Sequence, residues 1–133
     1  MRIETKSVSQ KYGSMPVLQD ISITAGAGEV VALLGPNGSG KSTLIKTIAD
    51  ILPPASGKVL IDGVDASAID PIDRAKLIGY VPQYFHYTPF TTVLDTVLIG
   101  RRPYMGWSVT DDDLAAVDKS LATMHVSDLA DGS

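Results

Sequence analysis

The 133-residue sequence contains no cysteine, so no disulfide holds the fold, which is typical of cytosolic proteins. It is also poor in positive charge: 11 Lys and Arg stand against 15 Asp and Glu, and the net charge is -4. Proteins that bind nucleic acid usually present a basic face, so we expect no nucleic-acid partner. No apolar run approaches the ~18 residues of a membrane span, and the first six residues lack the apolar core of a signal peptide. We therefore expect one soluble domain that would reach a membrane only through a partner.

The pattern of apolar residues predicts a mixed α/β fold. Short antiparallel strands are predicted over residues 3–12, 17–18 and 21–23, and a further strand over 58–61 turns at Asp62-Gly63. The apolar run 30–34 lacks alternation, which is typical of a strand covered on both faces, and residues 78–81 are interpreted in the same way. Helices are predicted over residues 42–51, 70–77, 92–98 and 111–124. In the last helix Leu114, Val117, Leu121 and Met124 form one apolar face.

A glycine-rich loop joins the apolar run 30–34 to the first predicted helix. Its sequence, G-P-N-G-S-G-K-S-T, matches the phosphate-binding pattern G-x-x-x-x-G-K-[ST] in full. Glycines let consecutive backbone N–H groups point inward around phosphate oxygens, and the following helix adds its positive N-terminal dipole. We expect Lys41 to contact the β and γ phosphates and Ser42 to bind Mg²⁺. The alternative is a glycine turn that caps a helix. The predicted ATP-binding residues of the loop are Gly35, Pro36, Asn37, Gly38, Ser39, Gly40, Lys41, Ser42 and Thr43.

The chain resembles the ATP-binding subunits of ABC transporters over essentially its whole length. The resemblance rests on the loop and on segments around it, in the family's order: residues 17–22, 28–33, 54–59, 61–63 and 78–83 (I-G-Y-V-P-Q, the Q-loop). It implies an α/β P-loop NTPase fold of the ABC type. The expected parts are an antiparallel β subdomain (1–28), a partial nucleotide-binding core from Walker A to the Q-loop (29–83) and the start of a helical subdomain (84–133).

Two residues outside the loop gain a role from this resemblance. Tyr12 occupies the position of the family's adenine-stacking aromatic, and its alternative role is to cover the edge of a strand. Gln83 is similar to the glutamine that reaches Mg²⁺ and the attacking water, and Lys41 and Gln83 are therefore the candidate catalytic residues. The alternative for Gln83 is a polar residue at a strand end.

The segment G-R-R-P-Y at residues 100–104 is similar to that of importers of iron-siderophores, haem and vitamin B12. This implies an importer ATPase for an iron-chelate, haem or cobalamin-like substrate. The alternative for the segment is a polar loop that ends a helix. Within the family, a soluble ATPase of DNA repair or translation is a second possibility, and a nucleotide-binding module without turnover is a third.

The family's signature motif, its Walker B strand with the catalytic glutamate and its switch histidine do not occur in these residues. His86 and His125 are interpreted as surface or loop residues. Asp111-Asp112-Asp113 is interpreted as a helix start capped by Thr110, because consecutive residues on a helix do not face one another. We expect the intact protein to hydrolyse ATP and this chain to bind Mg-ATP without turnover.

The resemblance also implies partners. These are a second copy of the ATPase, transmembrane permease subunits and, indirectly, an extracytoplasmic substrate-binding protein, with the ATPase on the cytoplasmic face of the membrane. Large aromatic and arginine side chains, enriched at interfaces, crowd residues 83–107, and we expect this stretch to face the permease. The alternative is that these side chains pack a junction between subdomains. They are Tyr84, Phe85, Tyr87, Phe90, Arg101, Arg102, Tyr104 and Trp107, together with Met105.

Overall fold

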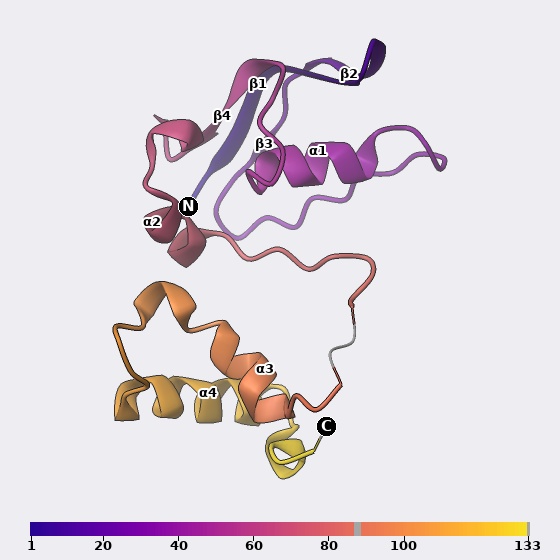
Figure 1. Ribbon diagram of the computed structural model, residues 1–133. Helices are drawn as coiled ribbons and strands as arrows, with labels where there is room; N and C mark the ends of the chain where they lie inside the picture. Colours follow the sequence, from indigo (N-terminus) through magenta and orange to yellow (C-terminus); the bar gives the residue numbers. More distant parts are fainter. Residues whose placement is uncertain (87–88, 133) are drawn as a thin grey trace. The chain divides into compact units, whose positions relative to one another are not determined.

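The computed structural model describes residues 1–86 and 89–132 and divides into two compact units. The first comprises Met1–Tyr80 and the second begins at Val81. The first unit contains the β-sheet and helices α1 and α2, and the second contains helices α3 and α4 (Figure 1).

The sheet of the first unit is antiparallel and is built around its first strand. Strand β1 (Ile3–Tyr12) pairs with β2 (Met15–Ile21) and, near its beginning, with β3 (Thr24–Ala25). It also pairs with β4 (Ser56–Ile61), which forms a hairpin with β5 (Val64–Asp65), so that the order is β2-β1-β4-β5. The predicted strand 3–12 and the hairpin turn at Asp62-Gly63 are confirmed, and both turn residues have the positive φ that this tight connection requires.

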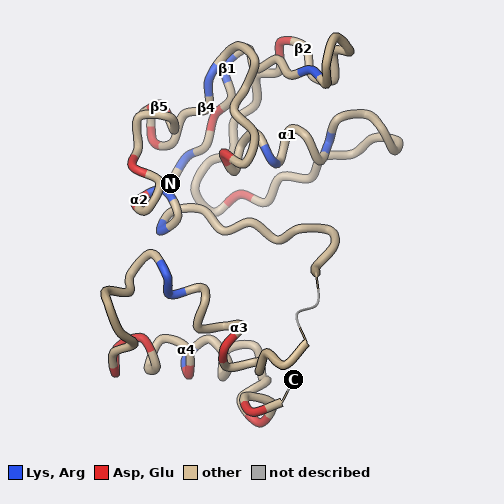
Figure 2. The backbone as a smooth tube through the Cα atoms, in the orientation of Figure 1, with Lys and Arg blue, Asp and Glu red and all other residues tan. Residues whose placement is uncertain are grey.

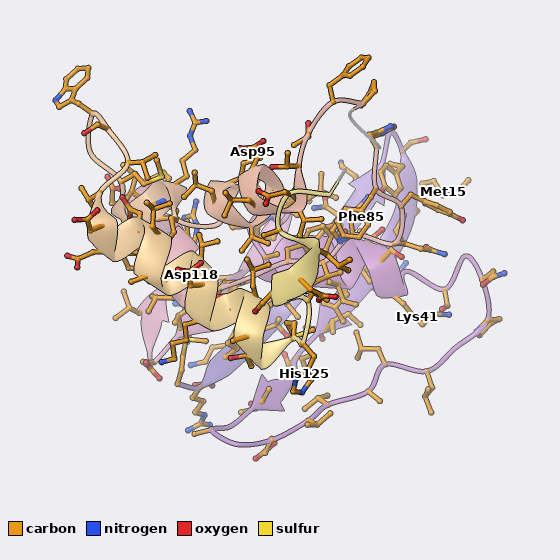
Figure 3. All side chains as sticks on the ribbon, turned by 90° about the horizontal axis from the view of Figure 1, so that it is seen from below. Met15, Lys41, Phe85, Asp95, Asp118 and His125 are labelled. Atoms are coloured by element: carbon orange, nitrogen blue, oxygen red, sulfur yellow. The ribbon has the colours of Figure 1, made fainter. Side chains whose placement is uncertain are left out.

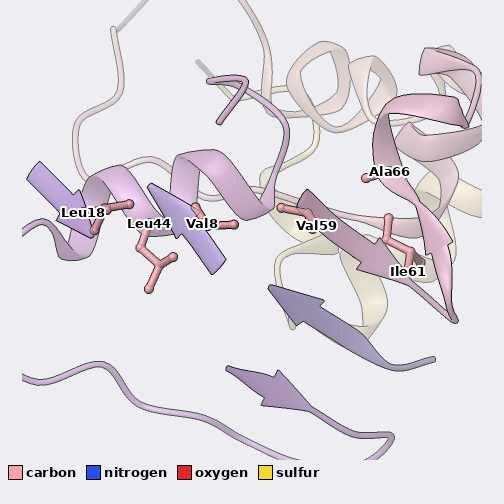
Figure 4. Packing of buried hydrophobic residues seen from close by; sticks show 6 residues of the cluster. All are labelled: Val8, Leu18, Leu44, Val59, Ile61 and Ala66. Atoms are coloured by element: carbon pink, nitrogen blue, oxygen red, sulfur yellow. The ribbon is translucent and has the colours of Figure 1, made fainter. Parts of the chain in front are cut away.

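Helix α1 (Lys41–Ile48) covers the sheet and closes the core of the first unit. It buries Thr43, Leu44 and Thr47, positions one turn apart that lie on one side of a helix. Figure 4 shows Leu44 of α1 beside Leu18 and Val8 of the strands. The buried cluster is Val8, Leu18, Leu44, Val59, Ile61 and Ala66.

The chain leaves the sheet through a short 3₁₀ helix (Ala66–Ala68) and helix α2 (Pro71–Leu77). The side chain of Asp70 accepts a hydrogen bond from the N–H of Ile72 at 2.9 Å and caps α2, the helix predicted over residues 70–77. Arg74 then joins α2 to the turn that follows α1, because its guanidinium lies 2.5 Å from the carboxylate of Asp50.

The second unit is a pair of helices, each started by a threonine. Helix α3 (Val93–Ile99) is capped by Thr92 and helix α4 (Asp111–Thr123) by Thr110, both in capping boxes. Short 3₁₀ helices follow at Arg102–Tyr104 and Ser127–Leu129. The apolar face predicted for the last helix is only half buried: Val117 and Leu121 are enclosed, whereas Leu114 and Met124 are exposed.

Two predicted buried strands are wrong. Residues 30–34 and 78–81 form no strand, and Val30, Leu34 and Val81 are 99%, 92% and 80% exposed. A strand satisfies its backbone N–H and C=O groups only by pairing with a neighbour. Among the residues that the structure describes, no strand pairs with either segment. Residues 26–40 therefore run as an irregular segment from β3 to α1 (Figure 1).

Within the described ranges, no helix is both long and apolar enough to cross a lipid bilayer.

Candidate nucleotide-binding site

The predicted phosphate loop is an exposed turn that leads directly into helix α1. Residues 37–38 form a turn, residues 39–40 a bend, and the helix begins at Lys41. The N–H of Ser39 donates to the carbonyl of Pro36 at 3.2 Å and closes the turn. The first N–H groups of a helix have no acceptor within it, so the start of α1 offers donors to an anion beside an accessible loop.

Gly40 is the residue where the loop meets the sheet. It has φ 92°, in the left-handed region, and precedes α1 without a side-chain cap. A Cβ at this position would lie 2.9 Å from a methyl of Leu18 and 3.0 Å from the carbonyl oxygen of Val17. Glycine therefore lets the loop backbone pack directly on strand β2, and this contact sets where the helix begins.

Lys41 is the charged group of the loop. Its ammonium donates hydrogen bonds to the carbonyl of Gly35 and, at 2.9 Å, to that of Pro36. Its side chain reaches from the first residue of α1 toward the preceding loop (Figure 3). An ammonium has three donors, so Lys41 can hold the loop through these carbonyls and still contact an anion. The arrangement places the positive charge within the turn rather than on the far side of the helix.

Three other predicted residues lie close to the start of α1. Ser42 follows Lys41 and is exposed, so its hydroxyl is accessible to a ligand. Thr43 is buried, and its hydroxyl lies 3.3 Å from the hydroxyl of Tyr12 at the end of β1. The fold thus brings Tyr12, which is 31 positions away in the sequence, to the beginning of this helix.

These residues fit a nucleoside triphosphate with its metal. Backbone donors, one ammonium and exposed hydroxyls match phosphate oxygens, whereas Mg²⁺ commonly takes few protein ligands and completes its shell with phosphates and water. The exposed hydroxyl of Ser42 is the group that would hold the metal. Among the described residues there is no group of three or more His, Asp or Glu that could hold a metal by itself.

A cavity of about 370 Å³ lies beside the loop, between α1, strands β1 and β3 and residues 31–33. Its walls are aliphatic apart from Lys41 and Ser42. Such a lining does not suit a triphosphate, whose oxygens need donors and charge. Val31 and Leu33, from the run in which a covered strand was predicted, form part of these walls.

The other predicted residues belong to the second unit. Gln83 is an exposed residue in a bend. Tyr84, Phe85, Phe90 and Trp107 are largely exposed, Tyr104 is half exposed, and Tyr87 lies outside the described residues. His86 and His125 are exposed, as predicted.

The acidic run at 111–113 is confirmed as a helix start and contains an unexpected ion pair. Asp111, Asp112 and Asp113 occupy the first turn of α4, where they gather negative charge (Figure 2). Asp113 is buried and accepts hydrogen bonds from the N–H of Thr110 and from Arg101, both at 3.0 Å. The hydrogen bond from the Thr110 backbone, and then the Arg101 guanidinium, lower the pKa of Asp113 below its ordinary value. The Arg101 guanidinium also stacks 4.5 Å from the ring centre of Tyr104.

Sequence reasoning missed two contacts of these residues, Tyr12 with Thr43 and Arg101 with Asp113. Each joins residues from different elements, 31 and 12 positions apart. No local pattern marks such pairs. The available signal was weaker: a tyrosine that ends a strand, and an arginine just before an acidic helix start.

Comparison with known proteins gives matches over almost the whole chain. Residues 18–132 match the family described as ABC transporter. An uncharacterised ABC transporter ATP-binding protein of Methanocaldococcus jannaschii is 41% identical over 98% of this chain and 51% of its own length. The petrobactin import ATP-binding protein YclP of Bacillus subtilis is 33% identical over 97% of this chain and 51% of its own. Other relatives are named as import or transport proteins for manganese, hemin and sulfate/thiosulfate. The chain spans about half the length of these first two relatives.

Solved structures agree with the fold. A nucleotide-free ATP-binding cassette from an ABC transporter superposes with a TM-score of 0.82 at 28% identity, over 99% of this chain and 57% of that one. A dimeric cassette with bound ADP and phosphate has a TM-score of 0.78 at 27% identity, over 97% and 60%. The fold of this chain is that of an ABC-type P-loop NTPase.

Proposed function

This chain belongs to the ABC transporter family, and we propose that it binds Mg-ATP through residues 35–43 as part of the ATPase subunit of an importer. One observation carries the proposal: a complete phosphate-binding sequence forms an exposed turn at the start of helix α1, with the Lys41 ammonium inside the turn. This is the geometry in which backbone donors, a helix dipole and a point charge act on the same phosphates.

In this proposal each residue has a defined task. The backbone of residues 35–40 surrounds the β-phosphate, Lys41 contacts the β and γ phosphates, and Ser42 binds Mg²⁺. Tyr12 supplies a ring for the adenine, which its place 3.3 Å from Thr43 supports. Gln83 would contact the metal and the attacking water from the Q-loop.

Hydrolysis is proposed for the intact protein. Phosphoryl transfer depends on placing metal, water and charge around the γ-phosphate, and we assign the complete arrangement to the intact protein. The dimeric cassette with ADP and phosphate supports a two-copy arrangement for this chain as well. We expect phosphate release by the 133-residue chain alone to stay at background.

The proposed transport partner is a permease, and the proposed cargo is an iron-chelate, haem or cobalamin-like compound. The petrobactin and hemin importers among the relatives support this class of cargo. Other relatives are named for manganese and for sulfate/thiosulfate, so membership of the family does not by itself specify the cargo. The exposed side chains of Tyr84, Phe85, Phe90 and Trp107 support a protein-binding surface in residues 83–107. The ATPase would then reach the membrane through this surface.

Calorimetric titration of the chain with Mg-ATP tests the proposal. Lys41→Ala removes the only charge of the loop and should weaken ATP by about 2–3 kcal/mol, or roughly 30- to 150-fold, the scale of hydrogen bonds to charged groups. Lys46→Ala is the matched control, because it removes the same side chain from the last turn of the same helix. Equal ATP affinity in Lys41→Ala and Lys46→Ala would overturn the proposal.

A further inference from the structure

The contact between Tyr12 and Thr43 connects the end of strand β1 to the start of helix α1 at the candidate site. Tyr12 ends strand β1, where its backbone is paired with Met15 across a two-residue turn. Thr43 is the third residue of helix α1. Their hydroxyl oxygens lie 3.3 Å apart, and either oxygen can donate. This pair therefore links the tyrosine ring to the helix that begins at the phosphate loop.

The two partners differ in how firmly they are held. Thr43 is 6% exposed and packs under α1, where its carbonyl accepts a hydrogen bond from the hydroxyl of Thr47 at 2.8 Å. Tyr12 is 56% exposed, so its ring has solvent beside it and room to turn. A buried group on a helix defines a position better than a ring at the end of a hairpin does. Thr43 is therefore the residue that restrains the position of the Tyr12 ring, rather than the reverse.

We propose that Thr43 is a positioning residue for base binding: its hydroxyl fixes the ring of Tyr12 in the orientation in which the ring stacks on the nucleobase. The inference rests on the proposed function, because it needs a nucleotide whose phosphates lie at the loop. It gives Thr43 a task separate from phosphate contact. Stacking is tolerant of base identity, so the fixed ring adds affinity for a purine nucleotide without selecting adenine over guanine.

The ratio of two dissociation constants isolates this task. Tripolyphosphate offers the loop the same phosphate chain as ATP but no nucleoside. The dissociation constant of Mg-tripolyphosphate divided by that of Mg-ATP therefore measures what the nucleoside contributes. A variant that only disturbs the loop or the helix weakens both ligands together and leaves the ratio unchanged. A variant that frees the ring lowers the ratio.

The experiment compares four variants at Tyr12 and Thr43, and one control variant, with the intact wild-type protein in calorimetric titrations. Tyr12→Phe and Thr43→Val should each lower the ratio by about two- to fivefold, the range of one neutral hydrogen bond of this length. The double variant should lower it no further than either single variant. Thr43→Ser keeps the hydroxyl and should keep the wild-type ratio. Tyr80→Phe, which removes a tyrosine hydroxyl elsewhere in the first unit, is the control.

Three results would overturn the inference. They are a wild-type ratio in Tyr12→Phe, a double variant whose effect is the product of the two single effects, or a Thr43→Ser variant that behaves like Thr43→Val. Each of these can occur while Lys41→Ala binds ATP more weakly than the wild-type protein does, which would leave the proposed function in place. Wild-type protein that binds neither ligand would contradict both proposals.

Discussion

Helix α1 and residues 30–34 are neighbours in the chain and were both predicted from apolar pattern, yet only the helix forms. The helix closes its hydrogen bonds within Lys41–Ile48 and buries Leu44 against the sheet. Residues 30–34 are more apolar but form no helix or strand, and Val30 and Leu34 are exposed. The difference is that a helix needs only its own residues, whereas a strand needs a partner. An apolar sequence is therefore not sufficient for a buried strand.

Of the substitutions that compare helix α1 with residues 30–34, we expect Leu44→Ala to change the free energy of unfolding most. Leu44→Ala removes a side chain from the centre of the cluster around Val8 and Val59, so it should lower the free energy of unfolding by about 2–4 kcal/mol. Urea unfolding followed by circular dichroism measures this. A loss below about 1 kcal/mol would mean that α1 does not pack on the sheet as described.

A smaller loss is expected where a helix begins with a local signal. Thr110 caps α4 by accepting from the N–H of Asp113, and Thr110→Ala should cost about 1 kcal/mol of unfolding free energy. Thr123→Ala removes the same kind of hydroxyl from the exposed last turn of α4 and should change the same quantity less. Equal losses of unfolding free energy in the two variants would show that the capping box stabilises α4 no more than an exposed threonine hydroxyl does.

Acidification should remove the contribution of the ion pair between Arg101 and Asp113 to the free energy of unfolding. Because the folded-state pKa of Asp113 lies below its ordinary value of 3.8, its ionised form stabilises the fold above that pH. This contribution is lost as the pH falls through the folded value. Wild-type stability should therefore approach that of Asp113→Asn on acidification from about pH 6 to about pH 2, measured by urea unfolding. A constant difference over this range would contradict the assigned shift.

The smallest effect is expected at Leu34. Leu34→Ala removes a side chain that is already exposed, so the unfolding free energy of the chain should change by no more than about 0.5 kcal/mol. The same urea experiment as for Leu44→Ala applies. A loss comparable with that at Leu44 would mean that residues 30–34 are covered in solution, for example by a strand of another copy.

Much of the fold follows from local signals in the sequence. The pattern in residues 3–12, Asp62-Gly63, Asp70-Pro71 and Thr110 each predicted an element that the structure contains. These signals work because turns, caps and helices are determined by neighbours in the chain. Residues 30–34 and 78–81 failed because pairing partners far away decide whether a strand forms.

The same distinction between local and distant contacts decides which parts of the candidate site could be predicted. The loop before Lys41 could be predicted because its pattern is contiguous, and the structure contains it as a turn before a helix. The contact of Tyr12 with Thr43 depends on how β1 packs against α1, which no spacing in the sequence shows. The roles assigned to the loop residues, Tyr12 and Gln83 stay predictions.

The central claim is that the loop ahead of α1 holds the phosphates of ATP, and backbone NMR tests it most directly. In a titration of ¹⁵N-labelled chain with Mg-ATP, the amide signals of Gly38, Gly40, Lys41 and Ser42 should shift most, because their N–H groups would donate to phosphate oxygens. Amides of α4 serve as the internal control and should move little. Saturable ATP binding that leaves the four loop signals unchanged and shifts others instead would contradict the account.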